Sequence, residues 1–254
     1  MNRLYSYILK NDNGSAPNPF WGTCTLTICK PAIRRTAKIG DWILGTGSKH
    51  SKLKDGKSHD LAGSLVYAMK IEAKMTLADY DKFCQRNLPE KIPDWRSPDW
   101  RKKLGDSMYD YSKGGEPAIR MAVHKEKNKV KDLSGLYALL SNHFYYFGEE
   151  PRPIPAVLKK TVKKNQGHLV IIDVNLIQQF EKWIKKFKKN KIYADPQGKY
   201  RFDRSADKIE SGVKQPRKRK PSRKSECLDF CQDRRSSVAS AESLQSGIDL
   251  KETK

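Results

Sequence analysis

The chain has 254 residues, with 51 lysines and arginines against 29 aspartates and glutamates, which gives a formal net charge of +22. A surplus of this size favours polyanionic partners such as nucleic acid or an anionic membrane surface. No segment approaches the roughly 20 apolar residues that a membrane span requires, and the N-terminus lacks the apolar run of a signal peptide. These features exclude a transmembrane protein and favour a cytoplasmic one. Five cysteines, an odd number, favour reduced thiols.

The first elements expected along the chain are two short strands joined by a turn-rich loop. Residues 4–9 and 24–28 have the alternating pattern of a strand with one buried face. Pro31 fits the first position of a helix, and Gly40 can end that helix in the left-handed conformation. The helix expected between them would place Arg34, Arg35 and Lys38 on its solvent side.

A glycine-containing loop follows the next expected strand, which covers residues 41–44. Its sequence, Gly45-Thr46-Gly47-Ser48-Lys49, offers backbone amides that can approach an anion closely. The glycine spacing is not that of a Walker A motif, and a lone Gly-x-Gly is common in ordinary turns. Phosphate binding at this loop and a plain turn are therefore both open at this point.

Later elements follow from periodicity and capping. Residues 65–71 predict a strand, and Thr76 with Asp79 three residues later predicts the start of a helix. Residues 87–116 have no regular period and predict a long loop. Strands are expected within residues 133–147 and at 169–172, and a helix is expected after Asn175, with a lysine-rich exposed side that suits phosphate, anionic lipid or solvent.

Most of the positive charge belongs to the part of the chain before the C-terminal segment. Residues 211–254 contain eleven basic and six acidic residues, which leaves +17 of the charge on the preceding part. Apolar residues become sparse after about Phe202, and a block of lysines, arginines and prolines follows. This composition predicts a folded domain over residues 1–203 and a disordered basic tail over residues 204–254.

The cysteines and histidines show no metal-binding spacing. Cys24 and Cys29 are five residues apart on an expected strand, which would place them on opposite faces, and no histidine lies near Cys227 and Cys231. We therefore expect no metal and no cofactor. Three histidines, His50, His59 and His124, lie in lysine-rich polar surroundings without a visible constellation.

Several motifs recur in order across roughly residues 3–190: YSYIL, APNPFWGTCTLTICKPAIRRTAKIGDWILGTGS, LVYAMKIEAKMTLADYDKF, SNHFYYFG and QGH. Together they resemble the prokaryotic nucleotide-modification-associated domain family of the second type. The resemblance implies a role in systems that modify or handle altered bases in DNA, often in phage-conflict loci. The segment LGDSMYDY at residues 104–111 departs from the family pattern, where a Cys and a His are expected, and the basic tail lies outside it.

The order of the expected elements is similar to that of PUA-like barrels, including EVE-type domains that bind modified bases. By this analogy we expect a single α+β domain, a mixed β-barrel or curved sheet with flanking helices. A base flipped out of its stack would lie in an aromatic slot, while basic residues hold the flanking phosphates.

Eleven residues are candidates for such a site. Phe20, Trp42 and Tyr146 are candidates for stacking; Asn18, Thr46 and Ser48 for base-edge or phosphate contacts; Lys30, Arg34 and Lys49 for backbone contacts; and His143 and His168 for phosphate or acid–base roles. Each has a structural alternative: a core position for Trp42 and Phe20, a turn for Asn18, and a hydrogen-bonded structural role for His168.

Two classes of function fit these residues. The first is a module that binds a modified nucleotide or base in DNA or RNA, with DNA favoured. The second is an enzyme that modifies a nucleotide or base, with His143, His168 and an acidic residue in one cleft. A membrane-surface role of the lysine-rich helix is a weaker third. We favour the first class because basic charge and aromatic residues are visible and a catalytic set is not.

Overall fold

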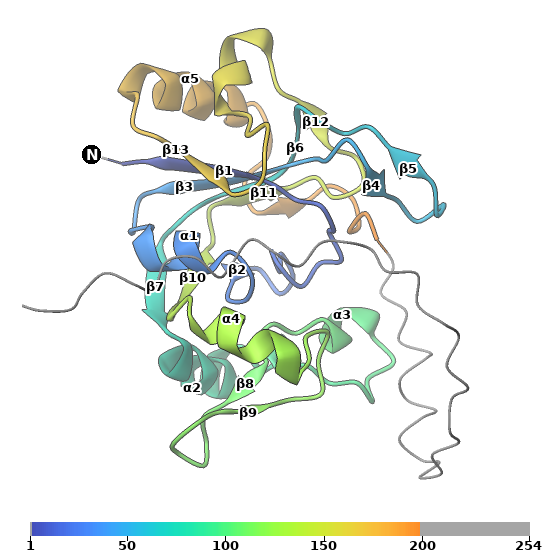
Figure 1. Ribbon diagram of the computed structural model, residues 1–254, viewed down its shortest axis with the longest axis vertical. Helices are drawn as coiled ribbons and strands as arrows, with labels where there is room; N and C mark the ends of the chain where they lie inside the picture. Colours follow the sequence, from blue (N-terminus) through green and yellow to red (C-terminus); the bar gives the residue numbers. More distant parts are fainter. Residues whose placement is uncertain (1, 199–254) are drawn as a thin grey trace, which may run out of the picture. The chain divides into compact units, whose positions relative to one another are not determined.

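The computed structural model describes residues 2–198 of the chain. Its main element is a mixed seven-stranded sheet (Figure 1). The strands follow the order β13 (His168–Ile171), β1 (Leu4–Ile8), β3 (Trp42–Thr46), β6 (Ser64–Lys70), β11 (Phe144–Tyr146) and β14 (Lys191–Ile192), and β12 (Arg152–Pro153) also pairs with β6. β1 runs parallel to β3 and β11 runs parallel to β14, whereas the other neighbours are antiparallel. Within the described residues no barrel closes, so the α+β class is confirmed and the closed-barrel form is not found.

A second, three-stranded sheet carries the segment that leads into the first helix. It consists of β2 (Cys24–Leu26), β10 (Tyr137–Ser141) and β7 (Ala73–Thr76). Two small hairpins complete the strands, β4 (Ser51–Lys52) with β5 (Ser58–His59) and β8 (Tyr109–Asp110) with β9 (Ala118–Ile119). The helices are α1 (Pro31–Thr36), α2 (Leu77–Asn87), α3 (Trp100–Lys103), α4 (Lys129–Leu133) and α5 (Val174–Ile184). Figure 1 shows α5 on one side of the large sheet, and α1 with β2 and β10 on the other.

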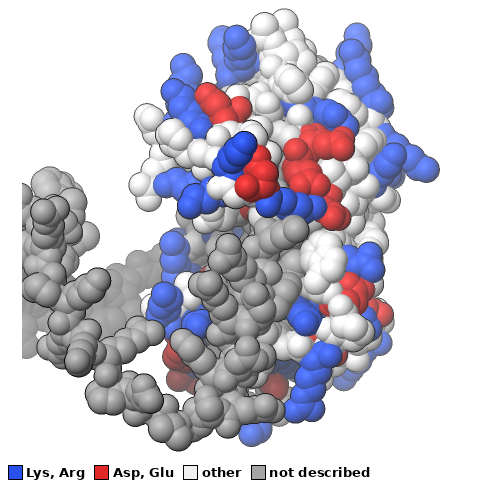
Figure 2. Space-filling view, turned by 90° about the vertical axis from the view of Figure 1, so that its right-hand side faces the viewer, with Lys and Arg blue, Asp and Glu red and all other residues white. Residues whose placement is uncertain are grey.

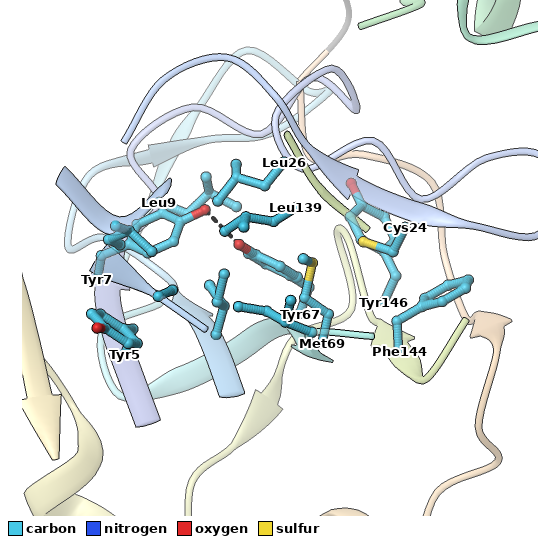
Figure 3. Packing of buried hydrophobic residues seen from close by; sticks show 14 of the residues in the cluster. Tyr5, Tyr7, Leu9, Cys24, Leu26, Tyr67, Met69, Leu139, Phe144 and Tyr146 are labelled. Carbon is cyan, nitrogen blue, oxygen red and sulfur yellow. Dashed lines mark hydrogen bonds between the residues drawn. The ribbon is translucent and has the colours of Figure 1, made fainter. Parts of the chain in front are cut away.

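Both faces of β1 are buried because successive side chains point to opposite sides of a strand. Leu4 packs into the cluster that joins the large sheet to α5, whereas Tyr5 and Tyr7 pack into the cluster that joins the sheet to β2, β10 and α1. Figure 3 shows the second cluster, in which the hydroxyls of Tyr7 and Tyr67 share a hydrogen bond of 2.8 Å. This tyrosine-rich face of the large sheet positions the site that is described in the next subsection.

Several predicted elements are confirmed, with changes at their ends. Thr76 caps α2 as expected, since its hydroxyl oxygen accepts from the N–H of Asp79 at 3.1 Å. The last helix is capped by Asp173, whose carboxylate accepts from Leu176 N at 3.1 Å, rather than by Asn175. α1 ends at Thr36, before Gly40, because Ala37 adopts an extended backbone.

Two loop predictions need correction. The segment predicted to be irregular, residues 87–116, contains a 3₁₀ turn (Pro89–Lys91), α3 and β8. In the glycine loop, Gly45 and Thr46 belong to β3. A Cβ at Gly45 would lie 2.4 Å from the ring of Tyr67, so this glycine serves close packing in the core.

Within residues 2–198, no helix has the length and apolar character needed to cross a bilayer. The predicted basic tail, residues 204–254, lies outside the described residues.

Candidate functional site

Cys29 lies in the short connection between β2 and α1, three residues beyond the end of the strand. Its φ is +57°, and that of the next residue, Lys30, is +40°. Two consecutive non-glycine residues in the left-handed region are uncommon, and each costs about 1 kcal/mol or more unless the surroundings hold it in place. The Cys29 side chain is half-buried, whereas Cys24 and Cys84 are fully buried.

The imidazole of His124 connects Cys29 to a buried carboxylate. Its Nε2 lies 3.7 Å from Sγ of Cys29, and its Nδ1 lies 2.5 Å from Oδ2 of Asp132. An ionised carboxylate can only accept, so Nδ1–H donates to Asp132 and Nε2 faces the thiol. The three side chains therefore stand in the order thiol, imidazole, carboxylate.

Asp132 is 1% exposed and accepts three hydrogen bonds. Its Oδ1 accepts from the backbone N–H of Cys29 at 3.0 Å, and its Oδ2 accepts from the hydroxyl of Tyr109 at 2.9 Å as well as from His124. Burial alone would raise the pKa of this carboxyl, but these hydrogen bonds and the adjacent imidazole lower it overall. Asp132 thus stays ionised and fixes the orientation of the His124 ring.

The pKa of His124 is raised to about 9. Burial opposes this, since it disfavours the charged ring, but the hydrogen bonds and charges of Asp132 and Cys29 outweigh burial. At neutral pH the ring therefore carries both protons.

A buried arginine ties together the segments that carry these residues. Arg34 is 0% exposed; its Nε donates to the carbonyl of Cys29 at 2.8 Å, its Nη1 to that of Tyr137 at 2.9 Å, and its Nη2 to that of Asp132. Burial lowers the pKa of Arg34 to about 10, and the nearby Asp132 partly offsets that effect. The expectation of a solvent-exposed Arg34 is therefore wrong, because α1 packs against both α4 and β10 and the guanidinium donates to three backbone carbonyls there.

The donor set argues for nucleophilic chemistry rather than for a metal. One ligand atom each from Cys29, His124 and Asp132 lies within 4.8 Å of the others, as a metal centre would require. However, Nδ1 of His124 is bonded to Asp132, and both Asp132 oxygens already accept protein hydrogen bonds. Only Sγ and Nε2 then face the same space, whereas zinc sites use three or four protein ligands. A thiol beside a base that a third group orients is the usual arrangement of a cysteine nucleophile.

Of the predicted residues, Lys30 follows Cys29 directly, and His168 lies near Lys30. Nζ of Lys30 is 4.2 Å from the centre of the Tyr7 ring, and His168 is the register partner of Tyr7 across β1 and β13. Tyr7 and Lys30 both interact electrostatically with Cys29. Two of the eleven candidates, Lys30 and Arg34, thus adjoin Cys29, and a third, His168, lies near Lys30.

Trp42 and His143 form a separate group on the large sheet. The Trp42 side chain is 1% exposed, and its Nε1 donates to Glu181 at 2.8 Å. The centres of the His143 and Trp42 rings are 5.2 Å apart. The expected convergence of His143 and His168 is not found, since β1, β3 and β6 separate β13 from β11, the strand that follows His143.

The remaining candidates occupy other places. Asn18, Phe20, Thr46 and Tyr146 are buried. Asn18 Nδ2 donates to Leu104 O at 3.0 Å, the hydroxyl of Tyr146 donates to Asp12 at 2.7 Å, and Thr46 Oγ1 donates to the carbonyl of Tyr7 at 3.3 Å. Phe20 packs edge-on against Trp100, with ring centres 5.5 Å apart. Ser48 and Lys49 lie in the turn after β3, where the hydroxyl oxygen of Ser48 accepts from the N–H of His50 at 3.2 Å.

A buried lysine braces the strand that leads to Cys29. Lys91 is 0% exposed, and its ammonium donates to the backbone carbonyl and Oδ1 of Asn18, to Thr23 O and to Thr25 Oγ1 at 2.7–3.0 Å. Thr25 Oγ1 in turn donates to Asp106 at 2.6 Å. Burial lowers the pKa of Lys91, and Asp106 opposes that shift. This network holds β2 and the loop that contains Asn18 in one arrangement.

Sequence reasoning missed His124, Asp132 and Tyr109 as site residues. His124 was expected to lack a constellation, and the structure overturns that expectation. Ninety-five positions separate Cys29 from His124, and no spacing rule covers such a distance. The available signals were a cysteine at a strand–helix junction and a single aspartate within a lysine-rich segment.

Comparison with known families shows that a model described as nucleotide modification associated domain 2 matches residues 1–204. No curated protein and no solved structure matches the chain. The family match includes every residue of the group around Cys29.

Proposed function

Since the chain belongs to the nucleotide modification associated domain 2 family, we propose that it is an enzyme that acts on a nucleotide, or on a base in nucleic acid, by covalent catalysis through Cys29. The observation that carries this proposal is the sequence of contacts from Sγ of Cys29 through His124 to Asp132. The family supplies the substrate class, and the three side chains supply the chemistry.

The reaction suited to this arrangement is substitution at an acyl or amidine carbon. The thiolate of Cys29 adds to that carbon, and the bond to the leaving nitrogen or oxygen breaks as His124 Nε2–H protonates it. Neutral His124 then takes a proton from water, the resulting hydroxide adds to the same carbon, and the C–S bond breaks to release the thiolate. Asp132 keeps the ring oriented in both steps.

The pKa of about 9 suits His124 to the first step, because the ring holds the proton that the leaving group needs at neutral pH. A charged imidazole beside the sulfur is also the usual neighbour of a cysteine nucleophile.

The alternative class is a module that reads modified bases through an aromatic slot, as in the PUA-like and EVE-type domains. Such a slot needs ring faces open to a ligand. The rings of Trp42 and Tyr146 are 1% and 0% exposed, and their polar atoms are bonded to Glu181 and Asp12. Stacking by these two residues would require them to leave the core, whereas the thiol chemistry needs Cys29, His124 and Asp132 in the positions that they already occupy.

The test is incubation of the full chain with N4-acetyl-2′-deoxycytidine 5′-monophosphate, a modified nucleotide with an acyl carbon and a nitrogen leaving group, and with nucleotides from hypermodified phage DNA. Mass spectrometry would follow both the nucleotides and the peptide that contains Cys29. We expect altered nucleotides and a covalent adduct on Cys29, both absent in C29A. Saturable binding of these nucleotides, unchanged in C29A and without turnover or adduct, would overturn the proposal in favour of a binding module.

A further inference from the structure

Cationic side chains gather around Lys30, the residue that follows Cys29. Lys30 follows Cys29 directly, and the Tyr7 ring holds its ammonium at 4.2 Å from the ring centre. The backbone pairing of Tyr7 with His168 places the imidazole of His168 on the neighbouring strand. Lys10 and Lys131 also lie close enough to Lys30 to repel it. We call the three lysines, Lys10, Lys30 and Lys131, the cationic group; His168 lies near Lys30 as an uncharged ring at neutral pH.

The three lysines and His168 come from four segments far apart in the sequence. Lys10 follows β1, Lys30 precedes α1, Lys131 lies in α4 next to Asp132, and His168 begins β13. Folding thus gathers like charges at one place, beside the one half-buried thiol among residues 2–198.

Within the described residues, the cationic group has no acidic partner, which sets it apart from other lysines of the fold. Lys54 pairs with Glu149 and Asp195 at 2.9 and 3.0 Å, and Lys70 pairs with Glu181 at 3.0 Å. Figure 2 shows the face that carries β4 and β5, where acidic side chains lie among the basic ones. Among the described residues, therefore, no carboxylate pairs with the cationic group to offset the repulsion between its members.

Repulsion within the group acts on the ionisation of its members. Burial lowers the pKa of Lys30, and Lys131 and Lys10 lower it further, while Cys29 opposes them. Burial likewise lowers the pKa of His168, with Lys163 and Lys30 adding to the effect. A bound dianion would relieve this repulsion and favour the charged forms.

We propose that the cationic group binds the phosphate of the nucleotide on which Cys29 acts, with Lys30 as its central contact. This inference rests on the proposed function and names the part of the substrate that the protein recognises by charge. Lysine ammonium groups act as point charges toward phosphate. Because Lys30 and Cys29 are adjacent, a phosphate held by Lys30 would bring the rest of the nucleotide within reach of the thiol.

The test compares two alkylating agents of the same reactivity class, iodoacetate and iodoacetamide, which differ in charge. Peptide mapping would give the rate at Cys29 for each agent, and the ratio of the two rates cancels the intrinsic reactivity of the thiol. We expect the ratio in the native chain to exceed that in the urea-unfolded chain by at least about threefold, since a local positive potential concentrates the anion.

Variants and competing ligands locate the effect. K30A should lower the ratio toward the unfolded value, and K131A, which removes an exposed side chain, should lower it in part. K182A, on an exposed position of α5 across the large sheet, is the charge-matched control and should leave the ratio unchanged. A K30A ratio equal to that of K182A, with K131A also without effect, would overturn the inference.

Phosphate-bearing competitors, at constant ionic strength with chloride as reference, identify the ligand chemistry. dCMP and inorganic phosphate should both lower the ratio, whereas deoxycytidine should not. An oligonucleotide without terminal phosphates carries phosphodiester groups only. If this oligonucleotide lowers the ratio and dCMP does not, the ligand is the phosphodiester backbone and not a terminal phosphate. Competition by deoxycytidine equal to that of dCMP would contradict phosphate recognition. The proposed function has separate readouts: it fails if the nucleotides are not turned over and Cys29 forms no adduct.

Discussion

Replacing His124 by asparagine should remove a pH-dependent part of the folding stability. The ring titrates at about 9 in the folded chain, against 6.5 for an ordinary histidine, because Asp132 and Cys29 favour its charged form more than burial opposes it. One pKa unit corresponds to 1.36 kcal/mol, so the shift amounts to about 3 kcal/mol. This value is an upper limit, since the side chain is 19% exposed and solvent screens part of the attraction.

The sign follows from the direction of the shift. A pKa raised on folding stabilises the native state fully below the unfolded value of 6.5, and the stabilisation is lost as the pH rises through about 9. Urea unfolding of wild type and H124N at pH 6 and pH 9.5 measures this directly. We expect the wild-type advantage to shrink by up to about 3 kcal/mol between these pH values, and H50N, which changes an exposed histidine, to show no such trend. An advantage of H124N over wild type at pH 6, or a difference independent of pH, would refute the account of the His124–Asp132 pair.

Four further variants test the packing and ionisation of buried groups. K91M should destabilise the chain by about 3–5 kcal/mol in urea unfolding, because it leaves Asn18 and Thr25 acceptors buried without their donor; a loss below about 1 kcal/mol would contradict the brace. G135A should lower the melting temperature by several degrees, since its Cβ would lie 2.1 Å from the guanidinium of Arg34. R34K should slow alkylation of Cys29, because lysine keeps the charge but not the planar guanidinium that donates to three carbonyls. In urea unfolding, the free energy of unfolding of D12N should rise relative to that of wild type by up to about 3 kcal/mol between pH 4 and pH 8. The reason is that burial raises the pKa of Asp12 to about 6, so the folded chain disfavours its carboxylate form. A difference between the two proteins that stays constant across this range would contradict this prediction.

The parts of the fold that could be predicted from sequence are those that local patterns determine. The Thr76–Asp79 cap and the apolar spacing of the last helix are signals within one turn of chain, and both elements are present. The end of α1 could not be predicted from Gly40, because the chain leaves the helix at Ala37 to pack that residue in the core. The open sheet depends on β1 pairing in parallel with β3, a contact that local patterns do not specify.

The site was harder to predict because its members meet only in the folded chain. Cys29 was considered as a metal ligand beside Cys24, when its partner is a histidine from the segment before α4. Arg34 was placed on a solvent face by helical periodicity, but a six-residue helix wedged against α4 buries it. Lys30 and His168 were chosen as anion contacts for their chemistry, and the pairing of β1 with β13 brings them to the same place.

The central claim, that Cys29 is a nucleophile activated by His124, is tested most directly by the rate at which iodoacetamide alkylates Cys29 at pH 7. Peptide mapping separates this residue from Cys24 and Cys84, which are buried, and from Cys227 and Cys231. We predict that Cys29 reacts first and that H124N slows it by at least about tenfold, whereas the matched H50N variant does not. An H124N rate equal to that of wild type, with Cys29 no faster than in the unfolded chain, would contradict the claim.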